Sequence, residues 1–141
     1  MSVPTIEAAM REAIEDRVAT LPLAGTYPIV WTDGPTYTPN ADRPYIRATW
    51  IPNVTRRLFI GSTDPHQRLG LLQVDMMAKK TWTGKQATQV AAQIAAHFPA
   101  DLKMTYSGVT CRVTSAPHVV GAIAGDVFLQ VPVTVPIECF A

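Results

Sequence analysis

The amino-acid sequence predicts an α+β domain, with a mostly antiparallel sheet and two helices packed on one face of it. Two segments carry apolar residues at helical spacing, and much of the remaining chain alternates between apolar and polar residues. The expected strands outnumber the helices and many are joined by short turns, which is typical of antiparallel sheets. The sequence shows no internal repeat and no second domain, so we expect one domain over residues 1–141.

The first helix is expected near residues 4–21. Ser2 is a candidate N-cap, Pro4 suits the first turn, and Pro22 ends the helix. Charged residues separate the members of a single apolar stripe. That stripe consists of Ile6, Ala9, Met10, Ala13, Ile14, Val18 and Leu21.

The next part of the chain predicts strands that are separated by proline-rich or turn-like segments. The clearest alternation of apolar and polar residues lies just before residue 79. We expect strands at residues 28–33, 44–52, 57–61 and 71–78, with a loop at 34–44 and a turn or loop at 62–67.

A second helix is expected over residues 84–97. Thr83 and Gln86 have the spacing of a capping box, and Pro99 ends the segment. Its buried face is predicted to contain Ala87, Val90, Ala91, Ile94, Ala95 and Phe98.

The C-terminal part predicts a hairpin, a weaker strand and a long final strand. Residues 102–106 and 109–114 flank Ser107-Gly108, which suits a tight turn. The weaker strand covers residues 119–123, and alternation continues from 126 to 140. Pro132 and Pro136 lack N–H donors on the same edge of this last strand. We therefore expect an edge strand, or one that pairs through a bulge, whose prolines prevent uncontrolled strand addition.

The composition is poor in charge. Only 16% of the residues are Asp, Glu, Lys or Arg, against about 25% in average soluble domains. A subunit whose surface is covered by neighbours needs fewer charges, and a weakly charged monomer is the alternative. The net charge of +1 predicts no long-range field for nucleic acid.

The N-terminal residues are too charged for a signal peptide, and no apolar stretch approaches the ~20 residues of a membrane-spanning helix. We therefore expect a soluble protein that is made in the cytoplasm and has no membrane partner.

The sequence predicts no catalytic residue, no metal site and no cofactor, so we do not expect an enzyme. It contains no glycine-rich phosphate loop and no Gly-x-Ser-x-Gly elbow. The histidines lack metal-ligand spacing and no carboxylate pair stands out. Cys111 and Cys139 have the pattern of small buried apolar residues.

Two groups of residues are candidates for an interface or for the lumen of a ring. The first is a basic cluster, which suits DNA in a channel or an acidic patch on a partner, with a solvated surface as the alternative. The second is Trp82, just before the second helix, for which core packing is the alternative. The basic residues are Arg43, Arg47, Arg56, Arg57 and Arg68.

Five short stretches stand out along the chain: Val30-Trp31-Thr32-Asp33, Tyr37-Thr38-Pro39, Pro44-Tyr45-Ile46-Arg47, Arg68-Leu69-Gly70-Leu71-Leu72-Gln73-Val74 and Ile94-Ala95-Ala96-His97-Phe98-Pro99. Together they resemble the family of tail terminator-like proteins from long-tailed phages. Leu69 departs from the family's usual Arg-Gly pair. The amphipathic first helix and the alternating last strand also agree with the family.

This resemblance implies a structural protein of the virion, in the neck region of the tail. Such a protein forms a ring, usually of six copies, on the end of the tail tube. The ring stops tube polymerisation, offers a docking surface to head-completion or connector proteins, and lets DNA pass through its lumen without sequence-specific binding. Head-to-tail contacts between two different patches close such a ring. A different head–tail joining protein, or a small enzyme or ligand-binding domain, are the alternatives.

Overall fold

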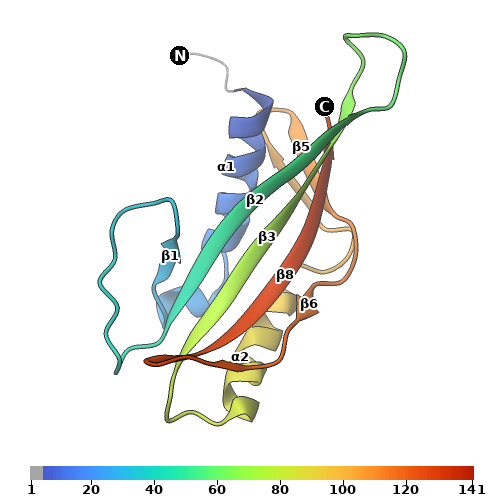
Figure 1. Ribbon diagram of the computed structural model, residues 1–141. Coiled ribbons are helices and arrows are strands. Elements are labelled where there is room, and N and C mark those ends of the chain that lie inside the picture. Colours follow the sequence, from blue (N-terminus) through green and yellow to red (C-terminus); the bar gives the residue numbers. More distant parts are fainter. Residues whose placement is uncertain (1–4) are drawn as a thin grey trace.

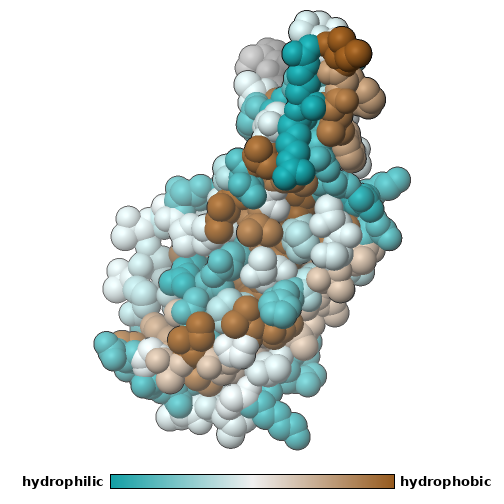
Figure 2. All heavy atoms as spheres, turned by 45° about the vertical axis from the view of Figure 1, so that its right-hand side comes forward, coloured by the Kyte–Doolittle hydropathy of each residue, from teal (hydrophilic) through white to brown (hydrophobic). Residues whose placement is uncertain are grey.

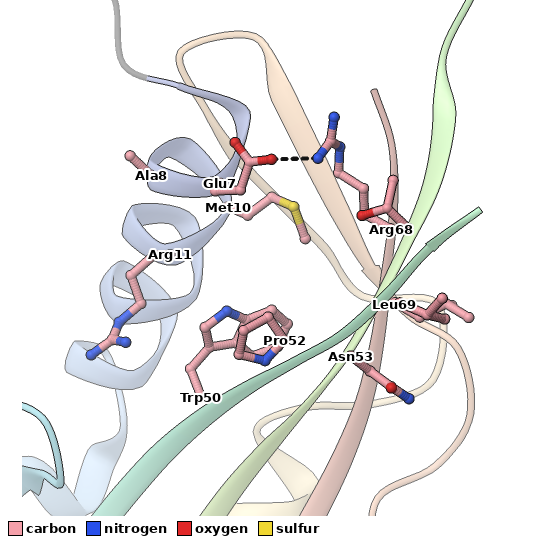
Figure 3. Close-up of a pocket in the computed structure, with 11 residues that line it drawn as sticks. Glu7, Ala8, Met10, Arg11, Trp50, Pro52, Asn53, Arg68 and Leu69 are labelled. Atoms are coloured by element: carbon pink, nitrogen blue, oxygen red, sulfur yellow. Dashed lines mark hydrogen bonds and ion pairs between the residues drawn. The ribbon is translucent and has the colours of Figure 1, made fainter. Parts of the chain in front are cut away.

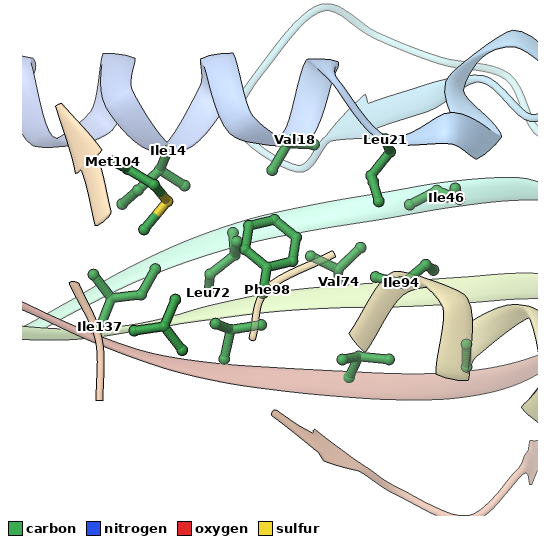
Figure 4. Close-up of a cluster of buried hydrophobic side chains, with 14 of the residues drawn as sticks. Ile14, Val18, Leu21, Ile46, Leu72, Val74, Ile94, Phe98, Met104 and Ile137 are labelled. Carbon is green, nitrogen blue, oxygen red and sulfur yellow. The ribbon is translucent and has the colours of Figure 1, made fainter. Parts of the chain in front are cut away.

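The computed structural model describes residues 5–141. A long curled sheet has the strand order β1-β2-β3-β8-β5-β4, with β6 and β7 also paired to β8. Both helices contribute to one core with side chains from a single face of this sheet (Figures 1 and 4). The prediction of a sheet that carries two helices is confirmed, but the sheet is mixed and contains one parallel pair.

Helix α1 (Ile6–Ala19) begins at Thr5, whose side chain accepts a hydrogen bond from the N–H of Ala8 at 3.2 Å. The predicted Ser2 cap and Pro4 lie outside the described residues. After the C-cap at Thr20, the chain forms the 3-10 turn η1 (Pro22–Gly25). Proline at its first position is compatible with that turn because its missing N–H needs no partner there.

Helix α2 (Gly84–Ala96) confirms the predicted second helix. Both hydrogen bonds of the capping box are present between Thr83 and Gln86, and the helix ends one residue before the predicted His97. Ala87, Ala91, Ile94 and the following Phe98 are fully buried, so the predicted apolar face is the one that packs on the sheet.

Strand β1 (Ile29–Trp31) pairs in parallel with the start of β2 (Tyr45–Arg57). The intervening loop returns the chain to the end from which β1 started, so the two strands run the same way (Figure 1). β2 then pairs with β3 (His66–Lys79) in a long antiparallel hairpin. The register shifts between Pro52 and Thr55.

The predicted separate strand at residues 57–61 is wrong. Residues up to Arg57 belong to β2, and β3 begins at His66, so the connecting loop is residues 58–65. The strand continues through Pro52 because its missing N–H faces the side of β2 away from β3, where β1 pairs only as far as Ala48.

The predicted hairpin is present as β4 (Lys103–Tyr106) and β5 (Val109–Val113). Its two turn residues, Ser107 and Gly108, have φ of 50° and 79°. Positive φ at both positions is typical of the turn that matches strand twist. In place of one weak strand at 119–123, the chain forms two short ones, β6 (His118–Val119) and β7 (Ile123–Ala124).

The prediction that the last strand lies at a sheet edge is wrong. β8 (Phe128–Phe140) is central, with β3 along one side and β5, β6 and β7 along the other. The missing N–H groups do interrupt one ladder. The carbonyls of Pro132 and Pro136 accept bonds from Val120 and Thr114, in the gaps between the three short strands. Several short partners thus replace one long strand on that side.

The main core lies between the two helices and the sheet (Figure 4). Ile14 and Val18 of α1 face Leu72 and Val74 of β3, and Phe98 lies between the helices and the sheet. Alternate residues of β8 from Val131 to Cys139 complete this core. The opposite face of the sheet carries no helix, and part of it is covered by a second cluster in which Val30 and Tyr37 pack on Tyr45, Met77 and Phe128.

Candidate assembly surfaces

The β2–β3 hairpin projects beyond the body of the domain (Figure 1). We call residues 53–65 the arm; every one of them is exposed. Leu58, Phe59 and Ile60 form its apolar tip, and Ile60 is 95% exposed. Figure 2 shows hydrophobic and hydrophilic residues side by side on this projection. Apolar side chains at this exposure mark a surface that is suited to a partner.

Arg57 folds back on the tip of the arm. Its guanidinium donates to the carbonyl of Phe59 at 3.0 Å and also to the carbonyl of Ile60. These bonds tie the tip backbone to β2 while its apolar side chains remain in solvent. The tip therefore has a defined shape before it meets any partner, which lowers the entropic cost of association.

A groove lies between α1 and the part of β2 that leads into the arm (Figure 3). It is a cavity of about 350 Å³ with a mainly apolar lining. Ion-paired and polar residues surround this lining at its rim. The lining residues are Glu7, Ala8, Met10, Arg11, Trp50, Pro52, Asn53, Val54, Thr55, Arg68 and Leu69.

The groove follows an open edge of the sheet. β1 pairs with β2 only from Ile46 to Ala48, so among the described strands the rest of β2 has no partner on that side. Pro52 lacks an N–H, which limits strand addition there. Side chains of α1 form the other wall, and Arg68 reaches Glu7 across the groove with an N–O distance of 2.5 Å.

The exposed charges of α1 divide into paired and unpaired groups. Arg11 binds Asp33 through two hydrogen bonds of 2.8 and 2.7 Å, binds Glu15 at 2.8 Å, and lies 4.4 Å from the Trp31 ring centre. Glu12 and Asp16 form no ion pair within residues 5–141. The negative charge of Asp16 raises the pKa of Glu12. This face of α1 thus has unbalanced negative charge.

The five predicted arginines do not form a single cluster. Arg43 is exposed in the loop before β2, and Arg47 lies on the helix-free face of the sheet. Arg56 and Arg57 belong to the arm, and Arg68 lies at the groove. The sequence did not show this distribution because the predicted strands stopped short of the hairpin that carries Arg56 and Arg57 away from the others.

The helix-free face holds two buried carboxylates that sequence reasoning did not select as interacting groups. Asp75 is 1% exposed and accepts bonds from Arg47 at 2.9 Å, Gln73 at 3.0 Å and Gln130 at 3.1 Å. Glu138 is bound in the same way by Arg112 and Gln67. Because Arg47, Gln130, Arg112 and Gln67 come from strands next to those of the carboxylates, the sheet register is needed to identify these networks.

Trp82 is half-buried at the start of α2. Its ring meets Tyr27 edge-on, with centroids 6.1 Å apart, and part of it packs against the main core. Its remaining surface lines a cavity of about 410 Å³ with Lys85, Gln86, Gln89 and Val90. Trp82 thus combines core packing with a surface that a partner can reach.

Residues 5–141 contain no group of three metal-ligating side chains. Cys111 and Cys139 face each other across β5 and β8 but are fully buried. Neither helix in this range has the length and apolar character required to cross a bilayer.

An α+β fold with a projecting apolar arm and a mainly apolar groove offers surfaces that a partner can contact. Residues 9–136 match the family model described as phage tail terminator protein. The chain therefore belongs to the phage tail terminator family, which is a family of structural virion proteins. It is thus a component of the phage tail.

Comparison with known structures agrees on the fold. One solved protein has a TM-score of 0.69 and 27% sequence identity, over 92% of this chain and 92% of that chain. Among curated proteins, none matches this sequence.

Proposed function

We propose that the protein forms a ring, of six copies as in the family resemblance, at the head-proximal end of the tail tube. In this position it ends tube polymerisation and provides the docking surface for head-completion or connector proteins. The observation that carries the proposal is the family match over residues 9–136, which spans nearly the whole chain. DNA passes through the lumen without sequence-specific binding, in keeping with the net charge of +1.

Two features of the fold support a closed ring. The arm and the groove are different surfaces on one chain, and a contact between unlike surfaces produces a ring when the rotation closes. The sheet has one helix-free face, on which charged side chains are already paired with each other. Such a face can border other subunits without leaving unpaired charge.

Tube growth in the presence of the protein tests the termination function. Tail-tube protein from the same phage is polymerised with and without the purified chain, and tube length is measured by electron microscopy. We expect shorter tubes with a ring at one end, whereas an unrelated protein of similar size leaves the length unchanged. Tubes that keep growing and carry no ring at either end would contradict the proposal.

Head joining is measured separately. Purified tubes that carry the ring are mixed with DNA-filled heads of the same phage, and joined particles are counted. We expect joining with ringed tubes and a large reduction with bare ones. Equal joining by both kinds of tube would remove the docking role and leave the termination role intact.

A further inference from the structure

The two cysteines of the chain, Cys111 and Cys139, lie directly opposite each other on β5 and β8. Both side chains are fully buried in the main core. Opposite residues of neighbouring strands place their side chains on the same face of the sheet, so the two thiols meet inside the core. A hydrogen bond between them raises the pKa of Cys111 and lowers the pKa of Cys139, as expected for two sulfur groups in contact.

The backbone pairing at this position suits a disulfide. Val113, two residues after Cys111, directs its N–H to Leu102 at 2.9 Å and its carbonyl to Asp101 at 2.8 Å, and therefore away from β8. Residues two apart on a strand share this direction, so Cys111 and Cys139 form a non-hydrogen-bonded pair of the β5–β8 ladder. The Cα atoms of such a pair are about 4.5 Å apart, within the range of about 4.4–6.8 Å that a disulfide requires.

The ladder that carries the two cysteines is short. The register of β5 with β8 covers three residue pairs, with Cys111 opposite Cys139 at one end. Pro132 and Pro136 lack the N–H groups that would extend the pairing along β8. Among the described strands β4 pairs with β5 alone, so a covalent link here would fix the whole β4–β5 hairpin to the centre of the sheet.

We propose that Cys111 and Cys139 are made as thiols and form a disulfide in the released virion, with a low-molecular-weight disulfide as the oxidant. Cytosolic thiols are kept reduced, whereas the surfaces of released virions meet oxidising surroundings. A component of the phage tail passes from the first environment to the second. The inference goes beyond the proposed ring and depends only on the place of the chain in the tail.

The link forms by thiol–disulfide exchange in two steps. The hydrogen bond from Cys111 and the positive charge of Arg68 lower the pKa of Cys139, so Cys139 is the first nucleophile. Its thiolate attacks one sulfur of the small disulfide, whose S–S bond breaks and releases one small thiolate. Cys111 then loses its proton and attacks Cys139 Sγ, which forms the protein disulfide and releases the second small thiolate. The two cysteine protons go to the released thiolates, so one small disulfide is reduced as the pair is oxidised.

Burial makes this exchange slow. The oxidant reaches the thiols only when β5 separates briefly from β8, and the short ladder between these strands keeps the required opening local. Once formed, the disulfide prevents this separation.

Oxidation of the purified chain tests the inference. The reduced protein is incubated with oxidised glutathione in native buffer, quenched with acid, blocked with a thiol reagent in denaturant and digested with trypsin. Trypsin cuts after Arg112, so Cys111 and Cys139 end on different peptides that only the disulfide joins. We expect the joined peptides to become the main product. The thermal unfolding midpoint should rise by on the order of 10 °C and return with a reductant.

Single replacements supply the matched controls. Cys111→Val and Cys139→Val each remove one thiol from a buried apolar position, and glutathione should not raise the unfolding midpoint of either variant. In the unchanged protein, two results would overturn the inference. One is the absence of the joined peptides, including a glutathione adduct that never resolves into them. The other is a linked pair that unfolds at a lower temperature than the reduced protein.

Phage particles provide a second measurement. Thiols are blocked at once in released particles and in infected cells before release, and the peptides are compared without reduction. We expect joined peptides from the particles and separate ones from the cells. Reduced cysteines in released particles would overturn the inference even if the purified chain oxidises. Ring formation on tail tubes is measured independently, and rings of the reduced protein would leave the proposed function in place.

Discussion

The indole ring of Trp50 lies directly against Gly70 on the neighbouring strand. A Cβ atom placed at Gly70 would come within 2.3 Å of the ring and within 2.7 Å of a second ring carbon. Gly70 is buried, and Trp50 is both half-buried against the core and part of the groove lining. The absence of a side chain at residue 70 therefore sets the position of the groove wall.

Gly70→Ala should destabilise the fold and displace the groove wall. The added methyl group forces the Trp50 ring outward, and overpacking of this kind costs about 1–3 kcal/mol. Urea unfolding gives the stability change, and tryptophan fluorescence of the folded state reports the ring movement. Gly121→Ala is the control, because nothing lies within 4 Å of a Cβ there and the expected change is within about 0.5 kcal/mol. Equal stability of the two variants would show that the ring moves freely.

Local features of the sequence predicted much of the fold. The capping residues Thr83 and Gln86 predicted the start of α2, and Ser107-Gly108 predicted the hairpin turn, because each depends on neighbours within a few positions. The central place of β8 could not be predicted in this way. Pro132 and Pro136 showed that one ladder is incomplete, but not that three short strands share that side.

The assembly surfaces were less accessible to sequence reasoning. Arg56 and Arg57 were selected as candidates, but the sequence could not show that they lie on a projecting arm, since the two long strands were predicted to cover only residues 44–52 and 71–78. The groove joins Met10 to Trp50, which are far apart in the chain. The groove exists because β1 pairs with only three residues of β2. The length of this pairing cannot be predicted from the local sequence.

Asp75→Ala should be strongly destabilising. It removes a buried carboxylate and leaves the donors of Arg47, Gln73 and Gln130 without their acceptor. We expect a loss of about 3 kcal/mol, at the lower end for a broken buried pair because the Arg47 side chain is 34% exposed. Chemical denaturation measures this value. Asp42→Ala, in an exposed loop, should change stability by less than about 0.5 kcal/mol.

A double replacement measures how much the ion pair between Arg47 and Asp75 contributes to stability, apart from their other contacts. Arg47→Met combined with Asp75→Leu removes both charges and should cost less than the two single changes together, because neither charge is left buried alone. Additive losses would mean that the pair acts as two independent residues. In that case the two glutamine contacts, rather than the ion pair, would explain the stability of this face.

Protonation of His97 should lower the free energy of unfolding of the protein under mildly acidic conditions. Burial lowers the pKa of His97 below its ordinary value of 6.5, and the positive charge of Arg17 acts in the same direction. Just below pH 6.5 the unfolded chain therefore binds more protons than the native one. The contribution of His97 to the free energy of unfolding is complete above that pH and is lost as the pH falls toward the lowered pKa. Thermal unfolding between about pH 7 and pH 5 measures the slope.

The variant His97→Gln isolates this contribution. His97 Nε2 lies 2.8 Å from Thr20 Oγ1 and 3.1 Å from the Arg17 carbonyl, so the ring joins the ends of the two helices. Glutamine can retain one of these contacts but does not titrate, and its stability profile should be flatter over the same range. A slope identical to that of the original protein would assign the pH dependence to other groups.

Cys111 and Cys139 should resist thiol reagents until the chain opens. They are direct partners across β5 and β8, and both are fully buried. Their shared hydrogen bond raises the pKa of Cys111 and lowers the pKa of Cys139, so the protection of the pair comes from burial. Reaction requires a thiolate and access to solvent, so native labelling should be on the order of a hundredfold slower than in denaturant. Ile123→Cys adds an exposed thiol as an internal standard that should react at once. Fast labelling of all three cysteines would show that β5 separates readily from β8, and that this side of the sheet is too weakly held to serve as a rigid part of a ring.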